Sequence, residues 1–233
     1  MIRIDQLRFA WPQDRADCLS IERVAVPAAR TVFLHGPSGS GKSTLLSLLA
    51  GVLLPREGRV ELLGVDWAAL PASRRDARRA DHVGYIFQQF NLLPYLDALG
   101  NVLLPCRFST RRRERAAAAA GTVLAAAQSL LQRVGLDAPL WHRPAGALSV
   151  GQQQRVAAAR ALIGSPEVVI ADEPTSALDT DLRETFMRLL LGECRAAGSA
   201  LVFVSHDRQL AAQFDVQLSL AELNHAGLAR AGA

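Results

Sequence analysis

Short apolar runs alternate with helix-like stretches along most of the chain. Strand-like runs cover residues 2–9, 19–24, 31–35, 59–63, 83–87, 168–171, 201–205 and 216–220. Between the later runs the apolar positions recur with a helical period, most clearly over 180–197, where Gly198 marks the end. Short apolar strands that alternate with helices predict an α/β fold with a mainly parallel sheet covered on both faces.

The segment 89–164 breaks this alternation. It is poor in strand-like runs and rich in alanine, at 116–120 and 125–127, where flanking Leu, Val and Arg indicate packed helices. It predicts an α-helical subdomain inserted between two core segments, 1–88 and 165–233. No tandem repeat is visible, so we expect residues 1–233 to form a single domain.

Composition narrows the class of protein. Half of the 233 residues are hydrophobic and 21% are charged, which excludes a disordered chain and allows a sizeable core. No apolar stretch is long enough to span a bilayer, and residues 1–9 alternate like a strand and lack the apolar centre of a signal peptide. Cys18, Cys106 and Cys194 lie far apart without metal-ligand spacing, so we expect reduced thiols in a cytosolic protein.

The net charge is +4, and arginine forms two clusters. The first contains Arg74, Arg75, Arg78 and Arg79, and the second contains Arg111, Arg112, Arg113 and Arg115. Solvated helix faces explain both clusters most simply, and contact with anionic lipid headgroups or with nucleic acid is the alternative. Because no aromatic residues are interleaved with either cluster, no nucleic-acid partner is expected.

Lys42 is the only lysine among the 26 Lys and Arg residues. It lies in a G-x-x-x-x-G-K-[ST] loop between the strand-like run 31–35 and a helix-like run, 43–50, which Gly51 ends. The glycines of such a loop let backbone N–H groups turn toward a phosphate, and the following helix amino terminus favours negative charge. Lysine brings a compact charge on a flexible stem to the outer phosphates of a nucleotide. The predicted loop comprises Gly36, Pro37, Ser38, Gly39, Ser40, Gly41, Lys42, Ser43 and Thr44.

Two carboxylates end the apolar run at 168–171. Asp172 can hold Mg²⁺ through water opposite the Ser43 hydroxyl, a common arrangement beside such a loop. Glu173 then points toward the γ-phosphate and can orient or deprotonate the attacking water. A pair of exposed carboxylates at a strand end is the alternative interpretation. The neighbouring phosphate loop favours the catalytic one.

The run from Leu148 to Val156 resembles the signature motif of the ATP-binding cassette (ABC) ATPases, which is usually Leu-Ser-Gly-Gly-Gln. Other motifs of that family follow the same order along about residues 1–220. These are a glutamine after a strand (Gln88), a D-loop at 176–179, and a switch histidine, His206, between Ser205 and Asp207. Trp11 resembles the aromatic residue that stacks on adenine.

The resemblance implies a P-loop (RecA-like) core with an antiparallel β subdomain, ATP and Mg²⁺ as ligands, and a second cassette as partner. ATP would lie between the phosphate loop of one chain and the signature motif of the other. The implied catalytic residues are Glu173, His206, Lys42 and Gln88, and the implied metal ligands are Ser43, Gln88 and Asp172. Further nucleotide contacts are implied for Trp11, Ser149, Gly151, Gln152 and Asp179. Gln89 is the alternative to Gln88, and Phe9 is the alternative to Trp11.

Val150 departs from the family pattern, because it replaces the first glycine of the signature motif. Valine poorly tolerates a positive φ and places a branched side chain near the opposing nucleotide. The substitution bears on the rate or tightness of dimer closure and leaves the fold prediction unaffected. A backbone that tolerates valine is the favoured interpretation, and an impaired cassette is the alternative. Ser149 and Gly151, the expected phosphate contacts, are retained.

Cassettes of this kind usually drive separate membrane proteins, so we expect integral permease subunits as partners. The protein would then be cytoplasmic and peripheral on the inner face of the plasma (inner) membrane. The apolar run 90–95 predicts a docking surface, with local packing as the alternative. The stretch 86–94 resembles ATPases of the macrolide-exporter and lipoprotein-releasing group most closely. A regulatory cassette that drives a membrane partner without transport, and a soluble cassette acting on DNA or ribosomes, are the other classes considered.

Overall fold

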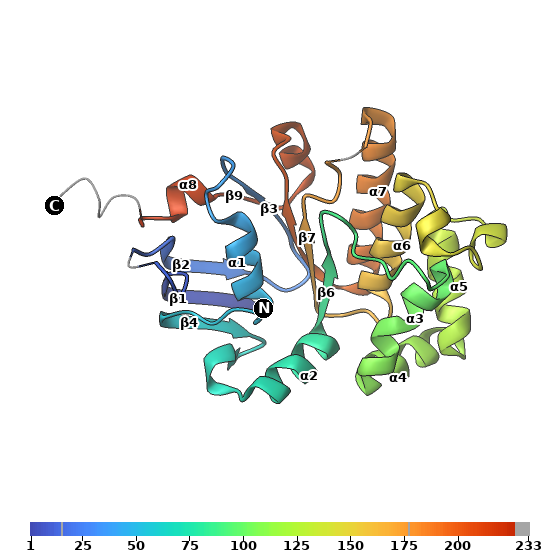
Figure 1. Ribbon diagram of the computed structural model, residues 1–233, viewed down its shortest axis with the longest axis horizontal. Helices are drawn as coiled ribbons and strands as arrows, with labels where there is room; N and C mark the ends of the chain where they lie inside the picture. Colours follow the sequence, from blue (N-terminus) through green and yellow to red (C-terminus); the bar gives the residue numbers. More distant parts are fainter. Residues whose placement is uncertain (15, 177, 227–233) are drawn as a thin grey trace.

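Two β-sheets run through the described part of the chain, residues 1–14, 16–176 and 178–226, in the computed structural model (Figure 1). The larger sheet is parallel, with strand order β6-β7-β8-β3-β9. The smaller sheet is antiparallel, with order β2-β1-β4-β5. The strands are β1 (Ile2–Phe9), β2 (Leu19–Val26), β3 (Thr31–His35), β4 (Glu57–Leu62), β5 (Val65–Asp66), β6 (Val83–Ile86), β7 (Val168–Asp172), β8 (Ala200–Val204) and β9 (Val216–Ser219).

The predicted α/β class is confirmed, and the predicted strands form within two residues of their expected bounds. The helices are α1 (Lys42–Leu49), α2 (Ala72–His82), α3 (Ala98–Phe108), α4 (Thr110–Ala120), α5 (Val123–Arg133), α6 (Val150–Leu162), α7 (Thr180–Ala197) and α8 (Leu220–Leu223). Helix α6 begins at Val150, inside the run that resembles the signature motif, because Ser149 and Gln152 form a capping box there.

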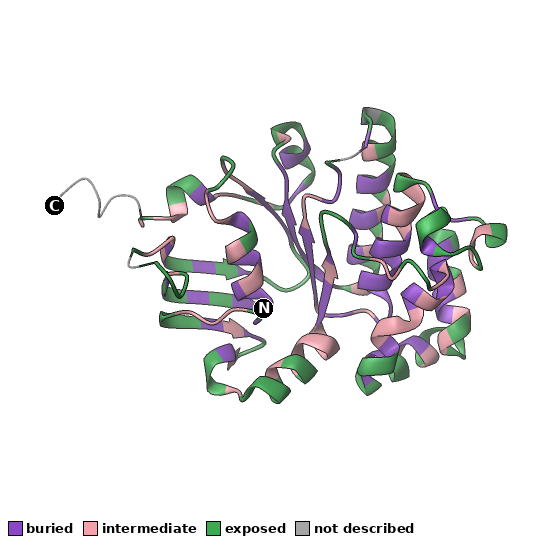
Figure 2. Cartoon of the chain, viewed as in Figure 1, coloured by how far each residue is buried: buried purple, intermediate pink, exposed green. Residues whose placement is uncertain are grey.

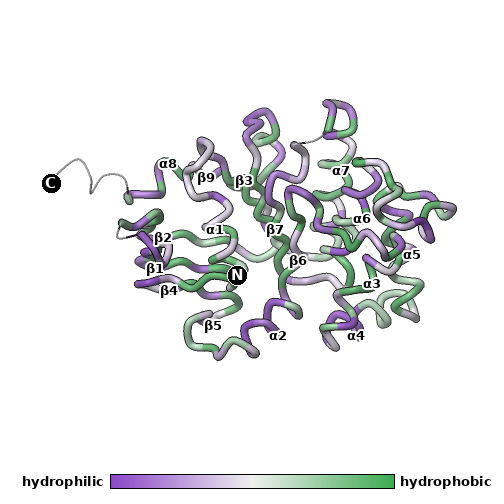
Figure 3. Tube along the Cα trace, in the orientation of Figure 1, coloured by the Kyte–Doolittle hydropathy of each residue, from purple (hydrophilic) through white to green (hydrophobic). Residues whose placement is uncertain are grey.

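Alternation along the buried strands divides the interior into two cores. In β8, Leu201 and Phe203 face one core while Val202 and Val204 face the other, as the two-residue period of a strand requires. The first core joins the parallel sheet to helices α3–α7, and the second joins it to α1 and the antiparallel sheet. The central strands are accordingly mostly buried and apolar (Figures 2 and 3). Helices α1 and α6 therefore lie on opposite faces of the parallel sheet.

Helix α6 approaches strand β6 very closely. A Cβ atom added to Gly84 in β6 would lie 2.2 Å from the Ala161 carbonyl oxygen, so a side chain at this position would force the two elements apart. Arg112 of α4 is buried here and donates to the carbonyls of Ala161 and Ile163 at 2.7 Å each. Burial lowers the pKa of Arg112 to about 10, which leaves it charged at neutral pH. It satisfies carbonyls at the carboxyl end of α6 that have no partner within the helix.

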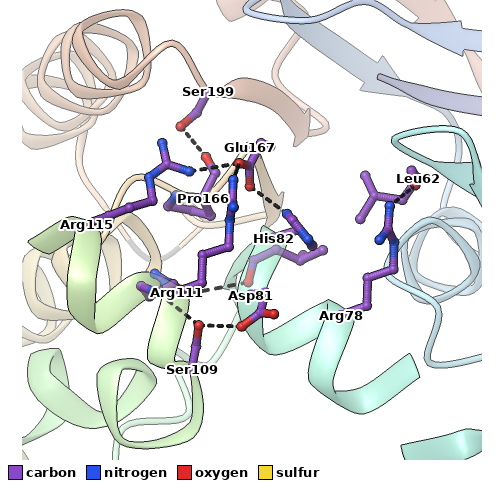
Figure 4. Close-up of polar contacts among 12 residues, drawn as sticks. Leu62, Arg78, Asp81, His82, Ser109, Arg111, Arg115, Pro166, Glu167 and Ser199 are labelled. Atoms are coloured by element: carbon purple, nitrogen blue, oxygen red, sulfur yellow. Dashed lines mark hydrogen bonds and ion pairs between the residues drawn. The ribbon is translucent and has the colours of Figure 1, made fainter. Parts of the chain in front are cut away.

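A charged cluster fastens α4 to the sheet at the edge where β6 and β7 begin (Figure 4). The Glu167 carboxylate accepts hydrogen bonds from Arg111, from Arg115 at 2.8 Å, and from His82 at 2.8 Å. Burial alone would raise the pKa of Glu167, but the hydrogen bonds from Arg111 and His82 outweigh it and lower the pKa to about 2. Counting the buried Arg112, three of the four arginines in the second cluster therefore have partners on other elements of the protein.

Glu167→Gln should lower the free energy of unfolding at pH 7 by about 1–3 kcal/mol, because hydrogen bonds to a charged group are lost. The pKa of Glu167 is lower in the folded state than in the unfolded state, so its stabilising effect is present above pH ~4.5 and is lost as pH falls toward about 2. The difference between the two proteins should therefore shrink below pH ~4.5 in urea titrations. Glu57→Gln, which breaks the exposed 3.9 Å pair with Arg8, is the control and should change little. An equal loss in both variants would contradict a special role for Glu167.

Candidate functional site

The predicted site residues gather at the carboxyl edge of the parallel sheet. The phosphate loop follows β3, Asp172 ends β7 and Glu173 comes directly after it, His206 follows β8, and Gln88 follows β6. Because β6, β7, β8 and β3 are consecutive neighbours in one parallel sheet, these four loops leave it side by side. This edge is where ligands bind in open parallel sheets.

The phosphate loop closes on its own lysine. Lys42 begins α1, is nearly buried, and its Nζ donates to the carbonyls of Pro37 at 2.9 Å and Gly36 at 3.1 Å. Gly41 has φ 96°, and a Cβ there would lie 2.9 Å from the Leu19 side chain, so this turn requires glycine. The buried Ser40 Oγ has no hydrogen-bond partner in the described residues. The Ser40 hydroxyl and the Lys42 ammonium group, at the amino terminus of a helix, are therefore suited to binding a polyphosphate.

Glu173 links the lysine to the switch histidine. Its Oε1 atom lies 2.6 Å from Nε2 of His206 and 4.0 Å from Nζ of Lys42. The Glu173 backbone has φ 46°, an uncommon conformation for a side chain of this size, and its N–H donates to the Val204 carbonyl at 3.1 Å. Strained backbone of this kind concentrates at functional sites. Three residues remote in sequence thus form one charged group.

Asp172 and Ser43 provide oxygen donors beside this group. Burial raises the pKa of Asp172 and the Glu173 charge adds to the effect, while the hydrogen bond from Ser43 and the Lys42 charge oppose it. A carboxylate and a hydroxyl are the hard oxygen donors that Mg²⁺ prefers, and Mg²⁺ usually takes one or two carboxylates plus substrate phosphates. The residues therefore fit this ion, although the described chain holds no cluster of three or more His, Cys, Asp or Glu side chains that could form a complete metal cage.

Two further predicted contacts lie at the margins. Gln88 is exposed just beyond β6, and within the described residues no hydrogen bond joins it to Ser43 or Asp172. Trp11 is 44% exposed whereas Phe9 is 6% exposed and belongs to the core, so only Trp11 offers a ring to a ligand. The two rings pack edge to face with centroids 5.4 Å apart.

The signature motif forms the first turn of helix α6. Ser149 caps α6: its Oγ accepts from the Gln152 N–H at 3.3 Å, and Gln152 Oε1 accepts from the Ser149 N–H at 2.9 Å. Val150 is the first residue of α6 and does not have a positive φ, so the favoured interpretation, a backbone that tolerates valine, is confirmed. Its side chain is 48% exposed. The expected effect on a facing nucleotide stays a prediction.

The signature motif and the phosphate loop do not meet within one chain, because α6 and α1 lie on opposite faces of the sheet (Figure 1). Asp179 caps α7 by accepting from the Leu182 N–H at 2.9 Å. Ala177, within the predicted D-loop, lies outside the described residues. Residues 227–233 of the predicted domain lie outside them as well.

The structure buries part of the predicted docking run 90–95, whose docking role stays a prediction. Phe90 is buried in the first core, and Leu92 and Leu93 are half-buried, while Tyr95 is 76% exposed. Local packing fixes Phe90, and Arg160 of α6 donates to its carbonyl and to that of Asn91, so aspartate at Phe90 would damage the fold. Two other exposed apolar side chains, Phe87 and Phe108, line a groove of about 540 Å³ between α2, β6 and α3, together with Tyr85 and Pro105 among others.

The first arginine cluster also contacts backbone carbonyls of other elements. Its Arg75, Arg78 and Arg79 donate to the carbonyls of Leu70, Leu62 and Gly51. Arg74 is exposed. Sequence patterns did not predict these contacts or those of Arg160, because most of the accepting carbonyls lie far along the chain from the arginines.

Comparison with known proteins places the chain in a family. The family described as ABC transporter matches residues 21–176. The macrolide export ATP-binding/permease protein MacB of Chromobacterium violaceum is 41% identical over 210 residues, 88% of this chain and 31% of MacB. The lipoprotein-releasing system ATP-binding protein LolD of Bordetella pertussis is 41% identical over 206 residues, 88% of this chain and 86% of LolD. The uncharacterized ABC transporter ATP-binding protein YbbA of Escherichia coli K12 is 44% identical over 197 residues, 84% of this chain and 83% of YbbA.

Among solved structures, the dimeric post-hydrolysis state of the ATP-binding cassette MJ0796, bound to ADP and Pi, aligns with a TM-score of 0.80 at 31% identity. The alignment covers 97% of this chain and 95% of that one. The chain belongs to the ABC transporter family. It is an ATP-binding cassette, a class of ATPase, and the predicted relation to the macrolide-exporter and lipoprotein-releasing proteins is confirmed. The chain spans about a third of MacB but most of LolD and YbbA.

Proposed function

We propose that this chain is the ATP-hydrolysing subunit of a transporter, that two copies close around two ATP molecules, and that the dimer drives a separate membrane permease. The contact of Glu173 with both His206 and Lys42 carries this proposal, since it joins a base, a polar donor and a phosphate-binding cation. In functional terms the chain is a single cassette, residues 1–233, with core segments 1–88 and 165–233 and a helical subdomain at 89–164.

The roles of the residues follow from their chemistry. Lys42 would exchange the Gly36 and Pro37 carbonyls for the outer phosphates of ATP, with the remaining loop residues around them. Glu173 would accept a proton from the attacking water, and His206 would donate to the γ-phosphate. Ser43, Asp172 and Gln88 would hold Mg²⁺, which when bound screens the phosphate charge. Trp11 would stack on the adenine.

A second copy completes the site. Ser149 and Gly151 lie at the amino terminus of α6, where backbone N–H groups and the helix dipole favour an anion. Because this terminus is remote from the phosphate loop of its own chain, the phosphate that it binds would belong to ATP held by the partner. Gln152 and Asp179 would contact the same nucleotide from that side. MJ0796 has been solved as a dimer, which supports a homodimer here.

The permease would dock in the groove beside β6, where Phe108 is 73% exposed, and against Tyr95 of the predicted docking run, which is 76% exposed. The similar protein MacB is named as an ATP-binding/permease protein, and LolD is named as the ATP-binding protein of a lipoprotein-releasing system. These names support a permease partner for this chain. No helix in the described residues has the length and apolar character needed to cross a bilayer. We infer a cytoplasmic subunit held peripherally on the inner face of the plasma (inner) membrane.

Recovery of a membrane partner tests this proposal. Used as bait in Mg-ATP, the purified protein should capture a multi-span membrane protein from detergent-solubilised native membranes. The double variant Tyr95→Asp with Phe108→Asp should lower that recovery about tenfold or more, because each substitution places a charge in an apolar contact. Leu124→Asp, on an exposed apolar residue of α5, is the control and should leave recovery unchanged. ATP hydrolysis should persist in all three proteins. Recovery of only ribosomes, DNA or soluble proteins would contradict the transporter function and favour a soluble cassette.

A further inference from the structure

Arg183, in the first turns of α7, connects the two loops that carry the catalytic pair. Its Nη1 donates to Oδ2 of Asp207 at 2.5 Å, and its Nη2 donates to the Leu178 carbonyl at 3.2 Å. The side chains of Arg183 and Asp207 are about three-quarters buried. A planar guanidinium suits two acceptors in different directions, whereas a lysine ammonium would act as a single point charge.

The two acceptors belong to the loops on either side of the contact between Glu173 and His206. Leu178 lies in the loop that begins at Glu173, and Asp207 directly follows His206. Asp207 is itself fixed, because its N–H donates to Ser205 Oγ at 3.1 Å and its Oδ1 accepts from the Gln209 N–H at 3.0 Å. His206 is therefore flanked by residues whose positions depend on the Asp207 carboxylate.

Few polar contacts hold these loops together. In the described residues, the loop after β7 meets the loop after β8 through the Glu173 N–H to the Val204 carbonyl, the Glu173 contact with His206, and the Arg183 bridge. The first contact lies at the base of the loops, and the second is the catalytic pair itself. The bridge is thus the polar contact that can fix the outer parts of both loops independently of the reacting groups.

We propose that Arg183 is a positioning residue for ATP hydrolysis, which sets His206 against Glu173 by bridging Asp207 and the Leu178 carbonyl. This inference rests on the proposed roles of Glu173 and His206. Within the part of the chain that the structure describes, no hydrogen bond or ion pair joins Arg183 to the phosphate loop, so the binding of ATP should not depend on it. Loss of the bridge lets the His206 loop shift, and small misplacements of reacting groups cost up to about a hundredfold in rate.

The test is a kinetic comparison of variants. Arg183→Ala should lower kcat for Mg-ATP about 10- to 100-fold with KM within about twofold. Arg183→Lys retains the positive charge but not the planar guanidinium, so its kcat should lie between those of Arg183→Ala and the wild type. Arg133→Ala is the matched control. It removes a 2.9 Å ion pair between Arg133 of α5 and Glu193, which lies on α7 like Arg183, and it should leave both kcat and KM unchanged.

A coupling measurement separates positioning from general destabilisation. If the bridge acts through Asp207, the loss of kcat in the double variant Arg183→Ala with Asp207→Ala should be no greater than in Asp207→Ala alone. Wild-type kcat in both Arg183 variants, an equal loss in Arg133→Ala, or additive losses in the double variant would overturn the inference. Normal hydrolysis by Glu173→Gln would instead overturn the proposed function, so the two failures are distinguishable.

Discussion

Glu173→Gln should lower the turnover of Mg-ATP by about 10²- to 10⁴-fold, the usual contribution of a positioned general base. Glutamine keeps the size of the side chain and its ability to hydrogen bond with His206, but it cannot take up a proton from the attacking water. The lysine and the phosphate loop are unaltered, so the dissociation constant for ATP should remain within a few-fold of the wild-type value.

Phosphate release at saturating Mg-ATP measures this effect, and fluorescence titration with an ATP analogue measures the affinity. Glu184→Gln, at an exposed position on α7, is the control for removing a glutamate charge and should hydrolyse ATP at the wild-type rate. Turnover by Glu173→Gln within a few-fold of wild type would mean that another group activates the water.

Lys42→Ala should weaken ATP binding by between about 30-fold and a few thousand-fold, since truncating one partner of a buried charge pair costs about 2–5 kcal/mol. The residue is nearly buried, and its Nζ is directed by the carbonyls of Gly36 and Pro37 toward the loop that would surround the phosphates. With no other lysine in the chain and no arginine in the loop, no neighbouring cation can substitute.

Isothermal titration with Mg-ATP measures this loss. Arg74→Ala removes one exposed positive charge from the surface and should leave the affinity unchanged, which separates a local contact from an effect of net charge. An affinity for ATP in Lys42→Ala that matches the wild type would exclude the phosphate loop as the nucleotide site.

The features that could be predicted from the sequence are those that depend on residues close together along the chain. The strand that precedes the phosphate loop and the helix after it follow from apolar runs and glycines, and Glu173 follows from a strand ending in carboxylates. The exact bounds of α7 also follow from its amphipathic period and from Gly198. Each of these features depends on residues within one helical turn or one strand.

The features that sequence reasoning missed depend on tertiary contacts. Phe90 looked like an exposed docking residue, yet it is buried because helices far along the chain pack over it. The arginine clusters suggested a charged surface, whereas Arg112 and its neighbours satisfy carbonyls and a carboxylate from remote elements. No local pattern predicts such pairings.

The most direct test of the central claim, that ATP is held between two copies of this cassette, is the mass in solution of the Glu173→Gln protein by light scattering after size exclusion. With Mg-ATP the account predicts a species of twice the chain mass of 25.1 kDa, and with Mg-ADP a monomer. The same species should be lost when Ser149→Phe blocks the helix start that would meet the partner's nucleotide. A monomer in Mg-ATP at saturating nucleotide would contradict the account.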